Sequence, residues 1–129
     1  MTNRSQRGDC TTSWLSASSR YIYLILRLVS SLAGSSRGPL ASFQLVQKKP
    51  VDAHSAAAFG LLAPVQVGRL KVEGKSAPEM IPVVKRNNCG MALEHSRKVL
   101  DVLGGNACAD EYRIGRHVAN LQVTNTYEG

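Results

Sequence analysis

MIPVVKRNNCGMALEHSRKVLDVL, residues 80–103, is the stretch of sequence that decides the fold. Apolar side chains recur along it at the spacing of one face of an α-helix. The residues that can share this buried face are Met80, Val83, Val84, Met91, Val99 and Leu103. Gly104 and Gly105 follow directly, and paired glycines are typical of a helix end. We therefore predict a helix over 80–103 with one buried stripe.

The residues just before this helix carry a start signal. Ser76 stands three residues before Glu79, as in a capping box, and Pro78 would lie in the first turn. Within the helix, Pro82 lacks a backbone donor and Gly90 adds conformational freedom, so both weaken it. We expect the helix to begin at a Ser76 cap and to continue in spite of these two residues.

A second helical segment precedes it, over residues 42–70. The segment is rich in Ala and Leu, and five apolar residues fall near one helical face: Leu45, Val46, Ala53, Ala57 and Leu61. Pro50 and Pro64 each cost an unbroken helix about 3 kcal/mol, through a lost hydrogen bond and a ring clash. We predict kinks or breaks at both prolines.

A third helical segment follows, over residues 112–123. Ile114, Val118 and Leu121 stand at i, i+4 and i+7, and Asp110 lies near the start, where an acidic residue favours a helix. No strand is clearly indicated. With aromatic residues at only 5%, the core must be built from Leu, Val, Ile and Ala, which also favours helices. The fold class is therefore predicted to be all-α.

The first 38 residues differ in composition from the rest. They hold four of the seven excess positive charges, because five arginines face one acidic residue, Asp9. GSSRGP, residues 34–39, is a linker-like break, and we place the domain boundary there: a leader over 1–38, predicted to be disordered, and a domain over 39–129. The leader has the composition of a mitochondrial transit peptide, with a secretory signal or an unstructured or mistranslated segment as alternatives. Its apolar run, residues 22–33, contains Arg27 and is shorter than the ~20 residues that span a bilayer.

Charge and metal-ligand patterns do not indicate a metal site or a nucleic-acid interface. Cys10, Cys89 and Cys108 are widely spaced, and the three histidines, His54, His95 and His117, share no ligand spacing, so we expect surface or capping histidines. The basic pairs at 48–49 and 85–86 are too sparse for a nucleic-acid patch and are interpreted as solvated helix faces. A leader that binds nucleic acid remains a third, weaker hypothesis.

Three motifs have both a plain and a chemical interpretation. LGGNACAD, residues 103–110, is either a helix C-cap or a backbone that approaches a phosphate. KRNNCG, residues 85–90, holds either a buried structural thiol or a nucleophile at Cys89. TNTYEG, residues 124–129, presents Glu128, which composition alone interprets as a solvated terminal carboxylate.

These motifs together resemble one protein family. From Pro39 to Gly129, without a gap, the chain resembles the C-terminal helical domain of the acyl-CoA dehydrogenases, and KRNNCG with NTYEG is typical of their glutaryl-CoA dehydrogenase branch. The matching segments are PLASFQLVQKK, QVGRLK, APEM, KRNNCGMAL, LGGNACADEY and RHVANLQVTNTYEG. The resemblance implies an incomplete C-terminal four-helix bundle, because nothing in the chain resembles the N-terminal helical domain, the β domain or the helix after YEG.

The resemblance also implies a chemistry and site residues. Glu128 is implied as the base that removes the α-proton of an acyl-CoA thioester while FAD takes the β-hydrogen. Tyr127 and Gly129 are implied to line the acyl-CoA site. The flavin contacts are implied to come from Phe43, Gln44, Leu103, Gly104 and Gly105, the last three approaching FAD of the adjacent subunit in a homotetramer. For the glutaryl-CoA branch, the product is crotonyl-CoA, the electron acceptor is electron-transferring flavoprotein, and the location is the mitochondrial matrix, in lysine and tryptophan breakdown.

The chain departs from the family pattern at several positions. Ala107 replaces the third glycine of the loop, and the arginine and Phe-Gly expected before PLA are absent. Pro50, Pro64 and Pro82 stand where the family helices continue. We therefore expect this chain alone not to turn over substrate. The alternative function is a non-catalytic helical module that docks on full-length subunits.

Overall fold

The computed structural model describes residues 34–35 and 38–127. Most of the predicted leader, together with Glu128 and Gly129, lies outside the described residues. The described part is helical, which confirms the predicted fold class. Its α-helices are α2 (Gln44–Val72), α3 (Met80–Leu103) and α4 (Ile114–Thr126). The short elements are β1 (Gly34–Ser35), β2 (Gly38–Pro39), η1 (Leu40–Ser42), η2 (Gly104–Cys108) and η3 (Asp110–Tyr112). The two-residue strands, which were not predicted, pair antiparallel.

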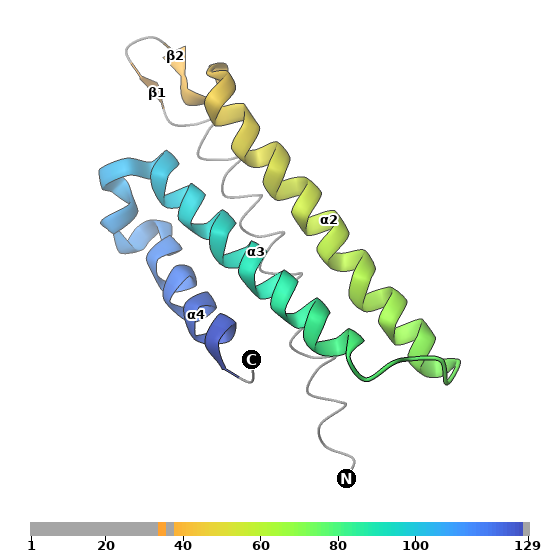
Figure 1. The fold of residues 1–129 in the computed structure, drawn as a ribbon. Coiled ribbons are helices and arrows are strands. Elements are labelled where there is room, and N and C mark those ends of the chain that lie inside the picture. The colour runs from red at the N-terminus through yellow and green to blue at the C-terminus, as the bar shows by residue number, and fades with distance from the viewer. Residues whose placement is uncertain (1–33, 36–37, 128–129) are drawn as a thin grey trace.

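The long helices lie side by side with α3 in the middle (Figure 1). α2 and α3 run in opposite directions, joined by residues 73–79, and α4 packs along the other side of α3 through η2 and η3. Lys49 and Asp101 pair across α2 and α3 at 3.5 Å. Arg97 on α3 donates a 2.8 Å hydrogen bond to the Gln122 side chain on α4. α3 is therefore the element to which both other helices are fixed.

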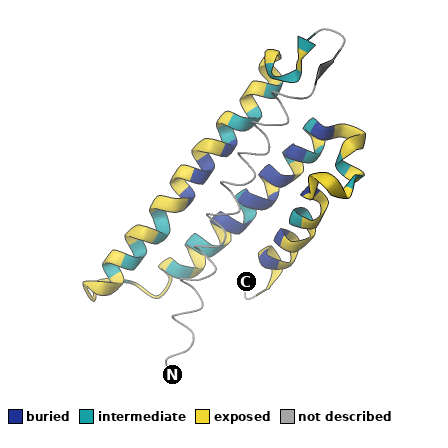
Figure 2. Cartoon of the chain, turned by 180° about the vertical axis from the view of Figure 1, so that it is seen from behind, coloured by how far each residue is buried: buried dark blue, intermediate teal, exposed yellow. Residues whose placement is uncertain are grey.

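The core lies along α3 and reaches into both neighbours. Figure 2 shows buried residues gathered on α3 and in the middle of α2. The core cluster consists of Ala53, Cys89, Ala92, Leu93, Val99, Leu103, Ile114 and Leu121. Small residues dominate the α2 side, where Ala53, Ala56, Ala57 and Gly60 are buried. Because small side chains let two helices approach closely, this face sets how near α2 lies to α3.

Kinks or breaks were predicted at Pro50 and Pro64, and the breaks do not occur, because α2 is one helix of 29 residues through both positions. A proline removes the donor for the carbonyl four residues earlier, so Pro64 leaves the carbonyl of Gly60 without its helical partner. That carbonyl instead accepts a 2.8 Å hydrogen bond from Asn88 Nδ2 on α3. A contact between helices thus offsets the bond lost within α2.

The predicted buried stripes are confirmed at some positions and wrong at others. Val99 and Leu103 are buried, whereas Met80 and Val83 are exposed. On α2, Ala53 and Ala57 are buried, whereas Leu45 and Leu61 are exposed, Leu45 by 82%. On α3 the exposed positions lie in the first turn. On α2 they include the middle of the helix, because its buried face consists of small residues and Leu61 lies to one side of that face.

The predicted bounds of α3, residues 80–103, are confirmed, but the predicted cap at its start is not. Gly104 follows Leu103 with φ +56°, in the left-handed region that glycine adopts without strain. At the start, α3 begins at Met80 and no side chain caps it, so the predicted Ser76 capping box does not form. Pro82 lies in the first turn, where the backbone N–H has no intrahelical acceptor and its absence costs little.

α4 confirms the third predicted helix, with Ile114 and Leu121 fully buried and Val118 packed against the core. It begins after Arg113, which has φ +57° and is the one non-glycine residue with positive φ in the described part of the chain. An acidic residue precedes the helix as predicted, and Asp110 pairs with Arg116 at 3.7 Å. The left-handed Arg113 turns the chain from η3 into α4.

Candidate functional site

The predicted flavin-contacting residues lie at one end of the helix pair. Phe43 and Gln44 stand at the start of α2, and Gly104 and Gly105 follow the end of α3. Because α2 and α3 run in opposite directions, both positions fall at the same end of the molecule (Figure 1). The fold therefore brings together two segments that are about sixty residues apart in the sequence.

The glycine pair forms an exposed backbone turn. Gly104 and Gly105 are both exposed, and a Cβ added at either would meet nothing within 4 Å. Their backbone is thus open to approach by a ligand. Leu103, predicted with them, has its side chain in the core, so its backbone alone could take part.

Ala107 shows why the loop tolerates a missing glycine. The residue lies in η2 without a positive φ, so an L side chain fits its backbone there. Its methyl group packs against the core cluster. The departure from the family pattern at this position leaves the turn at Gly104 in place.

Tyr127 lies at the opposite end of α3. It is the C-cap of α4, with extended backbone and its N–H bonded to the carbonyl of Val123 at 3.0 Å. Lys85 Nζ donates a hydrogen bond to the Tyr127 carbonyl, and the same nitrogen stands 5.0 Å from the centre of the Tyr127 ring. Lys85 and Leu103 are about 27 Å apart along α3, at ~1.5 Å per residue. The flavin-contacting candidates and the C-terminal candidates are therefore two separate groups.

The KRNNCG segment holds helices together. Asn88 bonds to α2, Lys85 bonds to the residue after α4, and a Cβ on Gly90 would meet the side chain of Asn125 at 3.9 Å. Cys89 is fully buried, and burial raises the pKa of its thiol despite the nearby Lys85 cation. A thiolate is disfavoured there, so of the two interpretations of Cys89 the structure supports the buried structural thiol.

His95 corrects the expectation of surface or capping histidines. Its side chain is buried between α3 and α2, and neither ring nitrogen has a hydrogen-bond partner. Burial, followed by the nearby Lys98 cation, lowers its pKa below the usual 6.5. Burial also lowers the pKa of His117, which is half-buried. His95 stands four residues after Met91 and four before Val99, within the predicted stripe, and this position is the signal for its burial.

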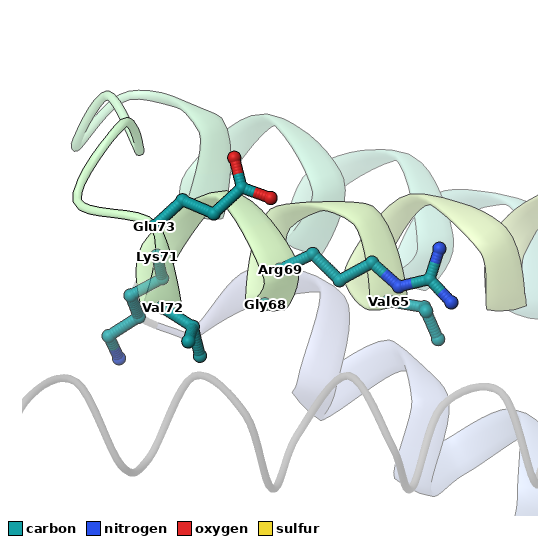
Figure 3. A pocket seen from close by; sticks show the side chains of 6 residues that line it. All are labelled: Val65, Gly68, Arg69, Lys71, Val72 and Glu73. Atoms are coloured by element: carbon teal, nitrogen blue, oxygen red, sulfur yellow. The ribbon is translucent and has the colours of Figure 1, made fainter.

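A shallow depression of about 730 Å³ lies elsewhere, at the last turns of α2. Figure 3 shows its lining side chains, which come from Val65, Gly68, Arg69, Lys71, Val72 and Glu73. It contains none of the predicted site residues. Among the described residues no group of His, Cys, Asp or Glu side chains could hold a metal ion. No helix in that same part of the chain is long and apolar enough to cross a membrane.

Solved structures of enzymes share this fold. A glutaryl-CoA dehydrogenase from Mycobacterium smegmatis is 31% identical with a TM-score of 0.83, over 89% of this chain and 30% of that chain. A glutaryl-CoA dehydrogenase from the same organism in complex with FADH2 is 27% identical with a TM-score of 0.87, over 95% of this chain and 32% of that chain. The butyryl-CoA dehydrogenase of Megasphaera elsdenii is 20% identical with a TM-score of 0.87, over 95% of this chain and 32% of that chain. At this identity the similarity shows the fold alone. The chain thus spans about a third of the length of these structures.

Residues 5–129 match the family described as acyl-CoA dehydrogenase, C-terminal domain. The matched range includes most of residues 1–38, and the boundary at residue 39 stays a prediction. The match covers nearly the whole chain, and it agrees with the fold, the exposed glycine turn and the sequence motifs. The chain belongs to the acyl-CoA dehydrogenase family, whose C-terminal domain it matches.

Proposed function

We propose that the chain supplies the C-terminal helical part of an FAD-dependent acyl-CoA dehydrogenase that acts on glutaryl-CoA. The observation that carries this proposal is the 31% identity and common fold shared with a glutaryl-CoA dehydrogenase over 89% of the chain. The motifs KRNNCG and NTYEG, which are typical of that branch, support the same substrate. In the fold these two motifs contact each other through Lys85 and Tyr127.

The residues at the glycine end are compatible with FAD. A backbone turn without side chains nearby lets a cofactor approach it closely, although the N–H of Gly104 is already bonded to the carbonyl of Leu100. Gly104 and Gly105 offer that backbone, and Phe43, 39% exposed at the same end, offers an aromatic surface. In this assignment the glycine turn and the Phe43–Gln44 pair hold the cofactor, which when bound accepts the β-hydrogen of the substrate.

Glu128 is the proposed base. An α-proton next to a thioester is weakly acidic, so a carboxylate that removes it must be desolvated, which raises its basicity. Hydrogen bonds to the thioester oxygen would stabilise the enolate that forms. Tyr127, directly before Glu128, and Gly129, directly after it, are proposed to line the acyl-CoA site. For glutaryl-CoA, loss of carbon dioxide from the unsaturated intermediate then gives crotonyl-CoA.

The separation of the two groups supports an assembly of subunits. Residues about 27 Å apart along α3 are too far apart to share one reacting atom. Two copies of the chain could each contribute one end to a site, which accords with the implied approach of Gly104 and Gly105 to FAD of an adjacent subunit. We propose a homotetramer, electron-transferring flavoprotein as electron acceptor, and the mitochondrial matrix as location, in lysine and tryptophan breakdown. The Ser- and Arg-rich composition of residues 1–38 supports the location.

A chimera tests the proposed function. Residues 39–129 replace the matching segment of the Mycobacterium smegmatis glutaryl-CoA dehydrogenase, which supplies the rest of the protein. The proposal predicts a yellow protein with one FAD per subunit that releases carbon dioxide from glutaryl-CoA and has a higher kcat/KM for glutaryl-CoA than for butyryl-CoA, which has no carboxylate to lose. A soluble, folded chimera with full FAD and no turnover of either thioester would contradict it.

A non-catalytic docking module is the second candidate, and one observation favours it. Val51, Leu62, Val65 and Val72 are exposed by 46–91%, and their spacing places them on one side of α2, away from α3. An apolar stripe of this kind can take another helix. If the chain is such a module, it purifies colourless and co-purifies with full-length subunits of the enzyme. A purified chain that carries stoichiometric flavin would exclude this second candidate.

A further inference from the structure

Asn125 and Tyr127, near the end of the described chain, lie against the KRNNCG segment at two places. Lys85 reaches Tyr127 with both a hydrogen bond to its carbonyl and a position over its ring. One and a half turns along α3, Gly90 faces Asn125, and a Cβ there would come within 3.9 Å of the Asn125 side chain. The two segments are 42 residues apart in the sequence at the Lys85–Tyr127 contact.

The Lys85 contact acts at the point where α4 ends. Tyr127 has φ −86° and ψ 148°, so the chain leaves the helix there in an extended conformation. The last carbonyl groups of a helix lack intrahelical donors, and a cation near this end is favoured by the helix dipole. Lys85 supplies both a donor and a positive charge, and its ammonium group also interacts with the electron-rich face of the ring.

We propose that Lys85 is a positioning residue: it anchors Tyr127, to which the proposed base Glu128 is directly bonded, and so restrains the backbone that leads to the base. This inference rests on the proposed function, in which Glu128 is the base. A helix end held by few contacts frays easily, because terminal turns open with little free energy. A base must be held within a fraction of an ångström of its proton, so an anchor one residue away has a direct effect on the reaction.

The anchor is tested first in the 129-residue chain, by amide hydrogen exchange at Tyr127 and Thr126. Lys85→Met keeps the side-chain length but removes the charge and the donors, and it should speed exchange at these amides roughly three- to tenfold. Lys85→Arg keeps the charge and the donors, so its exchange rates at these amides should stay within about twofold of the wild type. Arg86→Met is the matched control, because this exposed cation is turned by about 100° on the helix and should leave exchange unchanged.

A spectroscopic readout separates the contact with Tyr127 from a general effect on folding. The ring of Tyr127 should shift the proton resonances of the Lys85 ε-methylene, and Tyr127→Leu, which keeps the carbonyl, should abolish that shift. Equal exchange in Lys85→Met and the wild type would overturn the proposal. Equal acceleration by Lys85→Met and Arg86→Met would overturn it as well, because a general charge effect would then explain both.

The catalytic part is tested in the chimera with glutaryl-CoA. Lys85→Met should lower kcat roughly tenfold or more while KM changes less than about twofold, and Lys85→Arg should restore kcat. An unchanged kcat in Lys85→Met, with turnover lost in Glu128→Gln, would overturn the role of Lys85 and leave the base in place. Turnover retained in Glu128→Gln would instead overturn the proposed function, whatever the exchange experiment shows.

Discussion

Asn88 Nδ2 donates a 2.8 Å hydrogen bond to the carbonyl oxygen of Gly60, which Pro64 deprives of its helical donor. Asn88 is buried, so water cannot replace this bond. Proline and asparagine are both unfavourable within a helix. Here Asn88 on α3 supplies the donor that Pro64 removes from α2. This pairing explains how α2 continues through Pro64.

Asn88→Ala is predicted to lower the free energy of unfolding by about 1–3 kcal/mol, because it leaves the buried Gly60 carbonyl unpaired. In a Pro64→Ala background, the backbone N–H of residue 64 can bond to that carbonyl, so the same substitution should cost clearly less. Urea unfolding followed by circular dichroism measures both. Gln66→Ala, at an exposed amide side chain on α2, is the control. Additive effects of the Asn88 and Pro64 substitutions would refute the compensation.

Gly60→Ala and Gly68→Ala are predicted to have opposite effects. Both glycines lie within α2, where alanine is favoured by about 0.5–1 kcal/mol. At Gly60 the added Cβ comes within 3.3 Å of Asn88 Oδ1, so it disturbs the buried hydrogen bond and the variant should unfold at lower urea. At Gly68 a Cβ meets nothing within 4 Å, so that variant should be stabilised. A gain in stability from Gly60→Ala would show that the contact between Gly60 and Asn88 has room for a methyl group, which would contradict this prediction.

His95 is predicted to make the stability of the chain depend on pH. Its pKa is lowered in the folded state, chiefly by burial and then by Lys98, so the unfolded chain binds the proton more tightly. Stability should be full above pH 6.5, the ordinary pKa, and should fall as the pH drops from there toward the lowered folded pKa.

His95→Leu is the variant that tests this. It replaces an unpaired buried imidazole with an apolar side chain, so it should raise stability by about 1 kcal/mol at neutral pH and flatten the decline between pH 7 and 5. The half-buried His117 has a shift in the same direction, so His117→Gln serves as the comparison. A decline of equal steepness in the wild type and His95→Leu would assign the pH dependence to other groups.

Arg113→Gly is predicted to stabilise the chain by up to about 1 kcal/mol. Arg113 has φ +57°, a conformation that costs a residue with a Cβ about 1 kcal/mol or more and costs glycine almost nothing. Arg113→Ala removes the same side chain and keeps the strain, so it separates the backbone effect from the loss of charge. Thermal unfolding should give a higher Tm for the glycine variant than for the alanine variant, and the reverse order would contradict the role of the backbone.

The sequence predicted the helices where periodicity and a stop signal agreed. Val99, Leu103, Ile114 and Leu121 are buried as their spacing indicated, and Gly104 ends α3. Prediction from local sequence failed where a residue far away in the sequence determines whether a helix continues. The continuity of α2 through Pro64 depends on Asn88, which lies 24 residues later and was visible only as a poor helix former.

The candidate site could be predicted only in part for a related reason. Composition alone assigned Glu128 to a solvated end, and the family motifs were needed to connect it with a reaction. No spacing rule placed Lys85 next to Tyr127, because that contact depends on how α4 packs on α3. The spacing of His95 from Met91 and Val99 indicated burial, but a histidine is usually exposed, so the residue type led to the wrong expectation.

The measurement that tests the central claim most directly is the turnover of glutaryl-CoA by the chimera with and without Glu128→Gln. The amide is nearly the same size as the carboxylate but cannot accept the α-proton, so turnover should fall by about a hundredfold or more. The absorbance of bound FAD should stay the same, because Glu128 is not among the proposed flavin contacts. A Glu128→Gln chimera with wild-type turnover would contradict the assignment of the base and with it the proposed role of this chain.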